Sequence, residues 1–127
     1  MHERHLFEYA VLRVVPRVER EEFINVGVIL FCQSQKFLKA VYLLDKVRLT
    51  TIFPKIDIDE IGEYLAAFGK ICDGEQSGGA IGALPVASRF RWLTATRSSV
   101  VQASKVHPGY CLDPNATLER LLVELVL

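Results

Sequence analysis

Residues 9–32 read YAVLRVVPRVEREEFINVGVILFC: an apolar segment, a charged turn and a second apolar segment. The second apolar segment, Phe23–Phe31, is interrupted only by Asn25 and Gly27. Both residue types are poor strand formers. Their position inside an otherwise apolar strand therefore needs a reason beyond burial.

Three strands are predicted in the first third of the chain, at about 6–15, 23–32 and 37–44. Both alternating faces of the first are largely apolar, which is typical of an interior strand. Pro16 cannot donate to a strand ladder and ends it. Short connections favour an antiparallel meander. A further strand is expected at about 98–104.

The lengths of the two turns suggest a register for this meander. They place Arg13 opposite Asn25, and both Val11 and Tyr42 opposite Gly27. Gly27 then has one of two roles. Either the Tyr42 ring lies across it, or it belongs to a bulge that redirects the strand.

An amphipathic helix is predicted at about 58–72, because apolar residues recur there at alternating steps of three and four. This stripe consists of Ile58, Ile61, Leu65, Phe68 and Cys72. Asp57 resembles its N-cap, with Glu60 three positions on. Asp113 followed by Pro114 predicts the start of a C-terminal helix at about 114–126.

Three segments are less clear. Residues 45–53 are ambiguous, with a short helical turn as one interpretation. Residues 74–85 contain four glycines and indicate a flexible connection. In residues 86–97, periodicity does not distinguish a helix from a strand, and His107-Pro108-Gly109 is interpreted as a turn.

The chain has 127 residues, which predicts a single α+β domain over residues 1–127. No apolar stretch approaches the roughly 20 residues of a membrane helix, so we expect a cytoplasmic protein without membrane contact. Three widely spaced cysteines, Cys32, Cys72 and Cys111, predict buried reduced thiols. We expect no metal and no cofactor, and a homo-oligomer is left open.

The net charge is zero, which argues against a nucleic-acid-binding protein. The charge is nevertheless uneven. Residues 57–75 hold six acidic residues against Lys70 alone, whereas residues 76–112 hold four basic residues and no acid. The two regions either present a local anion site or face each other and water.

Six polar side chains at or near apolar segments form the candidate polar patch: Arg13, Glu22, Asn25, Arg89, Arg97 and His107. A buried arginine needs a partner, so a structural network of Arg13 with Glu22 or Asn25 is one interpretation. In the functional interpretation, Arg13 holds an anionic ligand. Glu22 and Asn25 then either orient this ligand or serve as acid and base. No catalytic residue is assigned.

Residues 89–92, Arg-Phe-Arg-Trp, interleave guanidinium groups with aromatic rings. This suits a phosphate-bearing ligand, a nucleotide or a single strand of nucleic acid. Alternatively, Trp92 belongs to the core and the arginines form surface ion pairs. With Gly27 and Tyr42, Trp92 makes up a structural signature. His107 could transfer protons near neutral pH.

Residues 13–16 (RVVP), 22–28 (EFINVGV), 89–98 (RFRWLTATRS) and 107–109 (HPG) resemble a bacterial domain-of-unknown-function family, DUF3037. The resemblance covers nearly the whole chain.

The chain departs from the family pattern at Glu21, where the pattern has Gly, and at Thr96, where it has Pro. Members are often encoded beside a HipA-like serine/threonine kinase, which implies a partner or accessory role.

Two hypotheses follow. One is a non-catalytic binding or regulatory module that partners this kinase. The other is a small enzyme or ligand-binding domain for a phosphorylated or nucleotide substrate. If neither holds, the signature residues serve folding alone.

Overall fold

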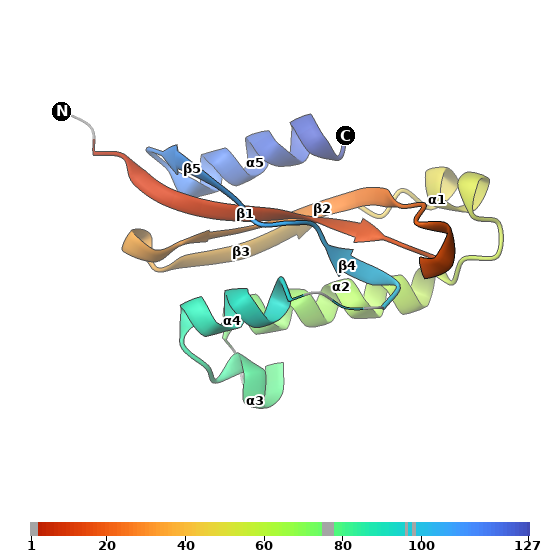
Figure 1. Cartoon of the computed structure of the whole chain (residues 1–127), viewed down its shortest axis with the longest axis horizontal. Helices are drawn as coiled ribbons and strands as arrows, with labels where there is room; N and C mark the ends of the chain where they lie inside the picture. The colour runs from red at the N-terminus through yellow and green to blue at the C-terminus, as the bar shows by residue number, and fades with distance from the viewer. Residues whose placement is uncertain (1–2, 75–77, 96, 98) are drawn as a thin grey trace.

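A five-stranded antiparallel sheet forms the middle layer of the computed structural model, which describes residues 3–74, 78–95, 97 and 99–127. The helix α5 covers one face of the sheet, and α2 and α4 cover the other (Figure 1). The strands are β1 (His5–Val14), β2 (Ile24–Cys32), β3 (Phe37–Tyr42), β4 (Val101–Ala103) and β5 (His107–Cys111). The predicted α+β class and three-strand meander are confirmed.

The helices are α1 (Lys46–Ile52), α2 (Ile58–Asp73), α3 (Gly79–Gly82), α4 (Val86–Leu93) and α5 (Pro114–Leu125), with short 3₁₀ turns η1 (Val18–Arg20) and η2 (Gln33–Gln35). Both predicted helix starts are confirmed. The Asp57 side chain accepts from the Glu60 backbone N–H at 3.1 Å, and Asp113 accepts from that of Asn115 at 3.0 Å. Among the described residues, no helix has the length and apolarity needed to cross a bilayer.

The turn expected at His107-Pro108-Gly109 is wrong, because these residues belong to β5. They pair with β1, where Pro108 lies opposite Glu8. Among the described strands, β5 pairs with β1 alone, and this edge position tolerates Pro108. A Cβ on Gly109 would lie 2.6 Å from the Phe7 ring, so this ring can lie against the strand only at a glycine.

Tertiary contacts also settle the ambiguous segments. The expected connection 74–85 contains α3, while 45–53 and 86–97 contain α1 and α4. In α4, the fully buried Phe90 stacks on Phe31 at 5.1 Å between ring centroids. The predicted strand 98–104 is shorter than expected, and Ser98 lies outside the described residues.

Two apolar clusters lie on opposite faces of the sheet. The first, against α2 and α4, includes Leu12, Ile29, Leu65 and Phe90. The second, beneath α5, includes Phe7, Val28, Leu30 and Leu118. Strands β1 and β2 supply side chains to both, which confirms β1 as an interior strand. The three cysteines are buried and free, as predicted.

A β-bulge lies where β2 carries its two unusual residues. Arg13 pairs with Asn25 and Leu12 with Gly27, so Val26 has no partner on β1. Simple alternation would put Asn25 on the face of Ile29, inside the first cluster. The bulge instead moves Asn25 to the α5 face, where its amide nitrogen donates to the Leu125 carbonyl.

The predicted pairing of Gly27 with Tyr42 is confirmed, but its pairing with Val11 is wrong because the bulge shifts β2 by one residue. A Cβ on Gly27 would lie 2.5 Å from the Val41 carbonyl oxygen and 2.8 Å from the Tyr42 Cβ. The atoms that this Cβ would meet first belong to the β3 backbone and to the Tyr42 Cβ. Gly27 therefore allows β3 to approach the bulged strand closely.

Arg89 of α4 ties that helix to the end of α2. Its Nη1 donates to the carbonyls of Ile71 at 2.9 Å and Cys72 at 2.6 Å, and its Nε donates to that of Leu84 at 3.0 Å. Carbonyls at a helix C-terminus carry partial negative charge, which a cation offsets. This member of the candidate patch thus has its partners inside the fold.

Replacing Gly27→Ala should lower the free energy of unfolding by about 1–3 kcal/mol, because the added Cβ overlaps β3. Chemical denaturation measures this. The matched control is Gly69→Ala in α2, where a Cβ would meet nothing within 4 Å. That variant should be neutral or up to about 1 kcal/mol more stable. Equal stability of Gly27→Ala and the parent protein would contradict the assigned role.

Replacing Arg89→Met should destabilise the protein by about 2 kcal/mol, because three carbonyls lose a charged donor. The control is Arg91→Met, which removes a partly exposed ion pair with Glu8 at 2.6 Å. We expect that loss to be at most about 1 kcal/mol. Thermal and urea unfolding of both variants would test the difference, and a smaller effect at Arg89 than at Arg91 would refute it.

Candidate functional site

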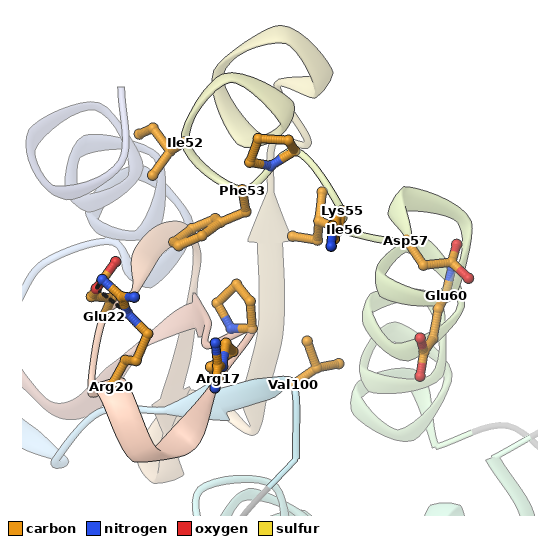
Figure 2. A pocket seen from close by; sticks show the side chains of 12 residues that line it. Arg17, Arg20, Glu22, Ile52, Phe53, Lys55, Ile56, Asp57, Glu60 and Val100 are labelled. Atoms are coloured by element: carbon orange, nitrogen blue, oxygen red, sulfur yellow. Dashed lines mark hydrogen bonds and ion pairs between the residues drawn. The ribbon is translucent and has the colours of Figure 1, made fainter.

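A hollow of about 690 Å³ lies between the η1 turn and the connection from α1 to α2 (Figure 2). We call it the turn groove. Its lining consists of Pro16, Arg17, Arg20, Glu22, Ile52, Phe53, Pro54, Lys55, Ile56, Asp57, Glu60 and Val100. Segments distant in the sequence therefore meet here, and one of them carries Glu22 of the predicted patch.

The inner part of the turn groove is apolar. Figure 2 shows the Phe53 ring in its middle, with Ile56 and Val100 nearby. All three side chains are half-buried and pack against the first core cluster. The groove thus has a floor that is continuous with the core, so its position is set by packing.

The two sides of the turn groove differ in charge. Arg17 and Arg20 lie on the η1 side, and Asp57 and Glu60 lie on the α2 side (Figure 2). Both arginines form exposed ion pairs, with Arg20 bound to Glu22 at 2.5 Å. An apolar floor between a basic and an acidic side can accept a ligand that carries both charges.

Glu21, beside the groove, adopts a left-handed backbone conformation with φ 57°. A side chain costs about 1 kcal/mol or more in this conformation, whereas Gly adopts it freely. A Gly here, as the resemblance implies, would adopt this conformation without that cost. The second departure, Thr96, lies outside the described residues.

Arg13 and Asn25 are brought together on paired strands, near the end of α5. The Arg13 guanidinium lies 4.0 Å from the centre of the Phe23 ring. The predicted network with Glu22 or Asn25 is not formed, because Glu22 binds Arg20 and the Asn25 amide nitrogen binds α5. Among the described residues, buried Arg13 Nε and Asn25 Oδ1 have no hydrogen-bond partner.

Arg97, which follows α4, contacts Trp92 in the last turn of that helix. The guanidinium lies 4.0 Å from the centre of the Trp92 ring, and its Nη2 donates to the Trp92 carbonyl. Trp92 is 40% exposed, so its assignment to the core is wrong. The reason is that α4 turns Phe90 and Leu93 inward instead. Burial lowers the pKa of Arg97 from its ordinary value.

His107 lies on β5, opposite Tyr9, with 5.3 Å between the ring centres. Tyr9 and Arg13 are four residues apart on β1, which is about 13 Å along a strand. The structure thus joins Arg13 with Asn25 and puts Glu22 in the adjoining groove. It places Arg89, Arg97 and His107 on other elements.

The clearest pKa shifts lie outside the turn groove. Burial raises the pKa of Cys72 to about 12, so this thiol stays protonated and unreactive at neutral pH. A hydrogen bond from Arg91 holds the pKa of Glu8 below its ordinary value. Among the described residues, no three His, Cys, Asp or Glu side chains gather in a way that could hold a metal ion.

Sequence reasoning missed most of the groove. The charged run 17–21 indicates only a turn, and Asp57 indicates only a helix cap. Phe53 ends the segment 45–53, in which the sequence pattern is ambiguous, and Lys55 lies just beyond it. No local signal shows that residues 17–22 and 52–60 face each other.

The family model described as Protein of unknown function (DUF3037) matches residues 9–126. No match was found among curated proteins or among solved structures. The match spans β1 to α5, including the bulged strand, the turn groove and the Arg13–Asn25 pair. The resemblance stated from the sequence is confirmed. The chain belongs to the DUF3037 family of proteins of unknown function.

Proposed function

We propose that this protein is a non-catalytic binding or regulatory module whose turn groove takes a peptide segment of a partner protein. The partner is a HipA-like kinase, as the gene neighbourhood of the family implies. One observation carries the proposal: the groove has an apolar floor between sides of opposite charge.

This arrangement suits a protein segment. Arginine and aromatic side chains are enriched in protein interfaces, and anchors in apolar pockets supply much of the binding energy. Phe53 and Ile56 offer such a pocket for one apolar side chain. Arg20 on one side and Glu60 on the other would orient a segment that carries an acidic residue at one end and a basic residue at the other.

The alternative is a phosphorylated or nucleotide ligand, which the cations Arg17, Arg20 and Lys55 favour. One feature works against it. Asp57 and Glu60 would repel a multiply charged anion. The groove therefore supports the peptide ligand better.

Co-expression with the neighbouring HipA-like kinase should give a complex that co-purifies at micromolar concentrations. Reversing the two charges of the basic side, Arg17→Glu with Arg20→Glu, should weaken this complex about tenfold or more, because the basic side is lost. Arg120→Glu is the matched control. It reverses an exposed charge on α5, outside the groove lining, and should leave the affinity unchanged.

Three outcomes would contradict the proposal. No complex at micromolar concentrations would remove the kinase as partner. A complex unaffected by the double variant, or equally weakened by Arg120→Glu, would remove the groove as its site. Calorimetric binding of ATP or inorganic phosphate in the groove would favour the alternative ligand.

A further inference from the structure

The surface of α2 carries a second hollow next to the turn groove. It measures about 300 Å³ and is lined by Glu60, Glu63, Tyr64 and Ala67. We call it the Tyr64 hollow. Glu60 also lines the turn groove, and Figure 2 shows it on the α2 side of that groove. The two hollows therefore share a lining residue, and a ligand that passes over Glu60 reaches both.

The Tyr64 hollow lies on a face of α2 that does not serve the core. Its four lining residues repeat at steps of three and four, so they share one face of the helix. All four are exposed. The buried residues of α2, such as Ile61, Leu65 and Phe68, belong to the first core cluster instead. Packing of the fold thus leaves this face of the helix without a described partner.

Glu60 and Glu63 give the hollow its charge. Neither forms an ion pair with any described residue, since the four ion pairs of this part of the chain involve other carboxylates. Like charges three residues apart on a helix repel each other. A cation bound between them would relieve this repulsion, so the charge of the hollow is complementary to a basic ligand.

Tyr64 and Ala67 give the hollow its shape. Tyr64 is 40% exposed, and the face of an aromatic ring attracts a cation. The short side chain of Ala67 leaves room beside this ring. The apolar stem of a long basic side chain can lie on such a surface while its charged end stays in water. Arginine fits better than lysine, because its planar guanidinium both stacks on a ring and matches a carboxylate.

We propose that the partner segment bound in the turn groove continues along α2 and places an arginine side chain in the Tyr64 hollow. The guanidinium stacks on the Tyr64 ring and donates to the Glu63 carboxylate. This inference rests on the proposed function, because it takes the turn groove as a peptide site. It adds the chemistry of the partner: an apolar anchor over Phe53, followed by a basic stretch that contains the arginine.

The occupant is part of a longer segment rather than a free cation. An exposed ion pair and an exposed cation–π contact each contribute little, so a single arginine would bind weakly. Joining it to an anchor in the turn groove makes its binding intramolecular and raises its effective concentration. The shared residue Glu60 shows that one chain can occupy both hollows.

The test selects binders to the full chain from a phage-displayed library of random dodecapeptides. We expect the selected peptides to combine a large apolar residue with at least one arginine. Replacing that arginine by alanine in a synthetic copy should weaken binding about fivefold, and replacing it by lysine should weaken it about threefold. Fluorescence anisotropy measures both affinities.

Variants of α2 assign the effect to the Tyr64 hollow. Tyr64→Leu removes the aromatic face and should weaken binding about threefold, whereas Tyr64→Phe should bind as the parent protein does. Glu63→Gln should also weaken binding about threefold. The matched control is Asp59→Asn, which removes an exposed charge of the same helix that lines neither hollow. Circular dichroism of each variant establishes that it remains folded.

A peptide without its arginine provides a further check, because Tyr64→Leu should not change its affinity. Absence of selected peptides, absence of arginine among them, or equal weakening by Asp59→Asn would overturn the inference. Peptides that lack arginine but lose affinity in the Arg17→Glu, Arg20→Glu variant would overturn it and leave the turn groove as a peptide site. Failure of the kinase to co-purify, with arginine-dependent peptide binding intact, would instead remove only the kinase as partner.

Discussion

The pairing of β1 with β2, including its bulge, is the constraint on which the rest of the structure depends. Both strands supply side chains to the clusters on both faces of the sheet. One extra residue, Val26, changes the face to which the start of β2 directs its side chains. Asn25 is thereby kept out of an apolar core, where an unpaired amide would be costly.

Part of the candidate polar patch lies near the start of β2. Glu22 lines the turn groove, and Phe23 supports Arg13 beside Asn25. Sites of function often lie where a regular pattern is broken, because an unbroken apolar strand has no polar group to offer. The Arg13–Asn25 pair is a product of this irregular entry into the sheet, and residues that precede β2 line the turn groove.

The residues outside this region show a different use of charge. Arg89 donates to carbonyls at the end of α2, and Arg91 binds Glu8 of β1. Arg97 stacks on Trp92. Arg89 thus joins the basic segment to the end of the acidic helix through backbone carbonyls. Three of the four basic residues of this segment have contacts within the fold.

Local patterns were enough to find the three-strand meander, α2, α5 and the pairing of Arg13 with Asn25. Strand alternation, helical spacing, caps and turn length depend on neighbours in the chain, which the sequence displays. The strand β5 was missed because its Pro and Gly indicate a turn, and pairing with β1 outweighs that preference. For α4, the periodicity of the sequence does not distinguish a helix from a strand. The folded chain, in which Phe90 is buried, shows a helix.

The turn groove and the unused atoms of Arg13 and Asn25 became visible only in the folded chain. Each arises from segments far apart in the sequence, such as the η1 turn and the start of α2. Which donor meets which acceptor depends on how sheet, helices and connections pack together. Residue type alone identified polar side chains in apolar strands, whereas their geometry showed which of them still lack a partner.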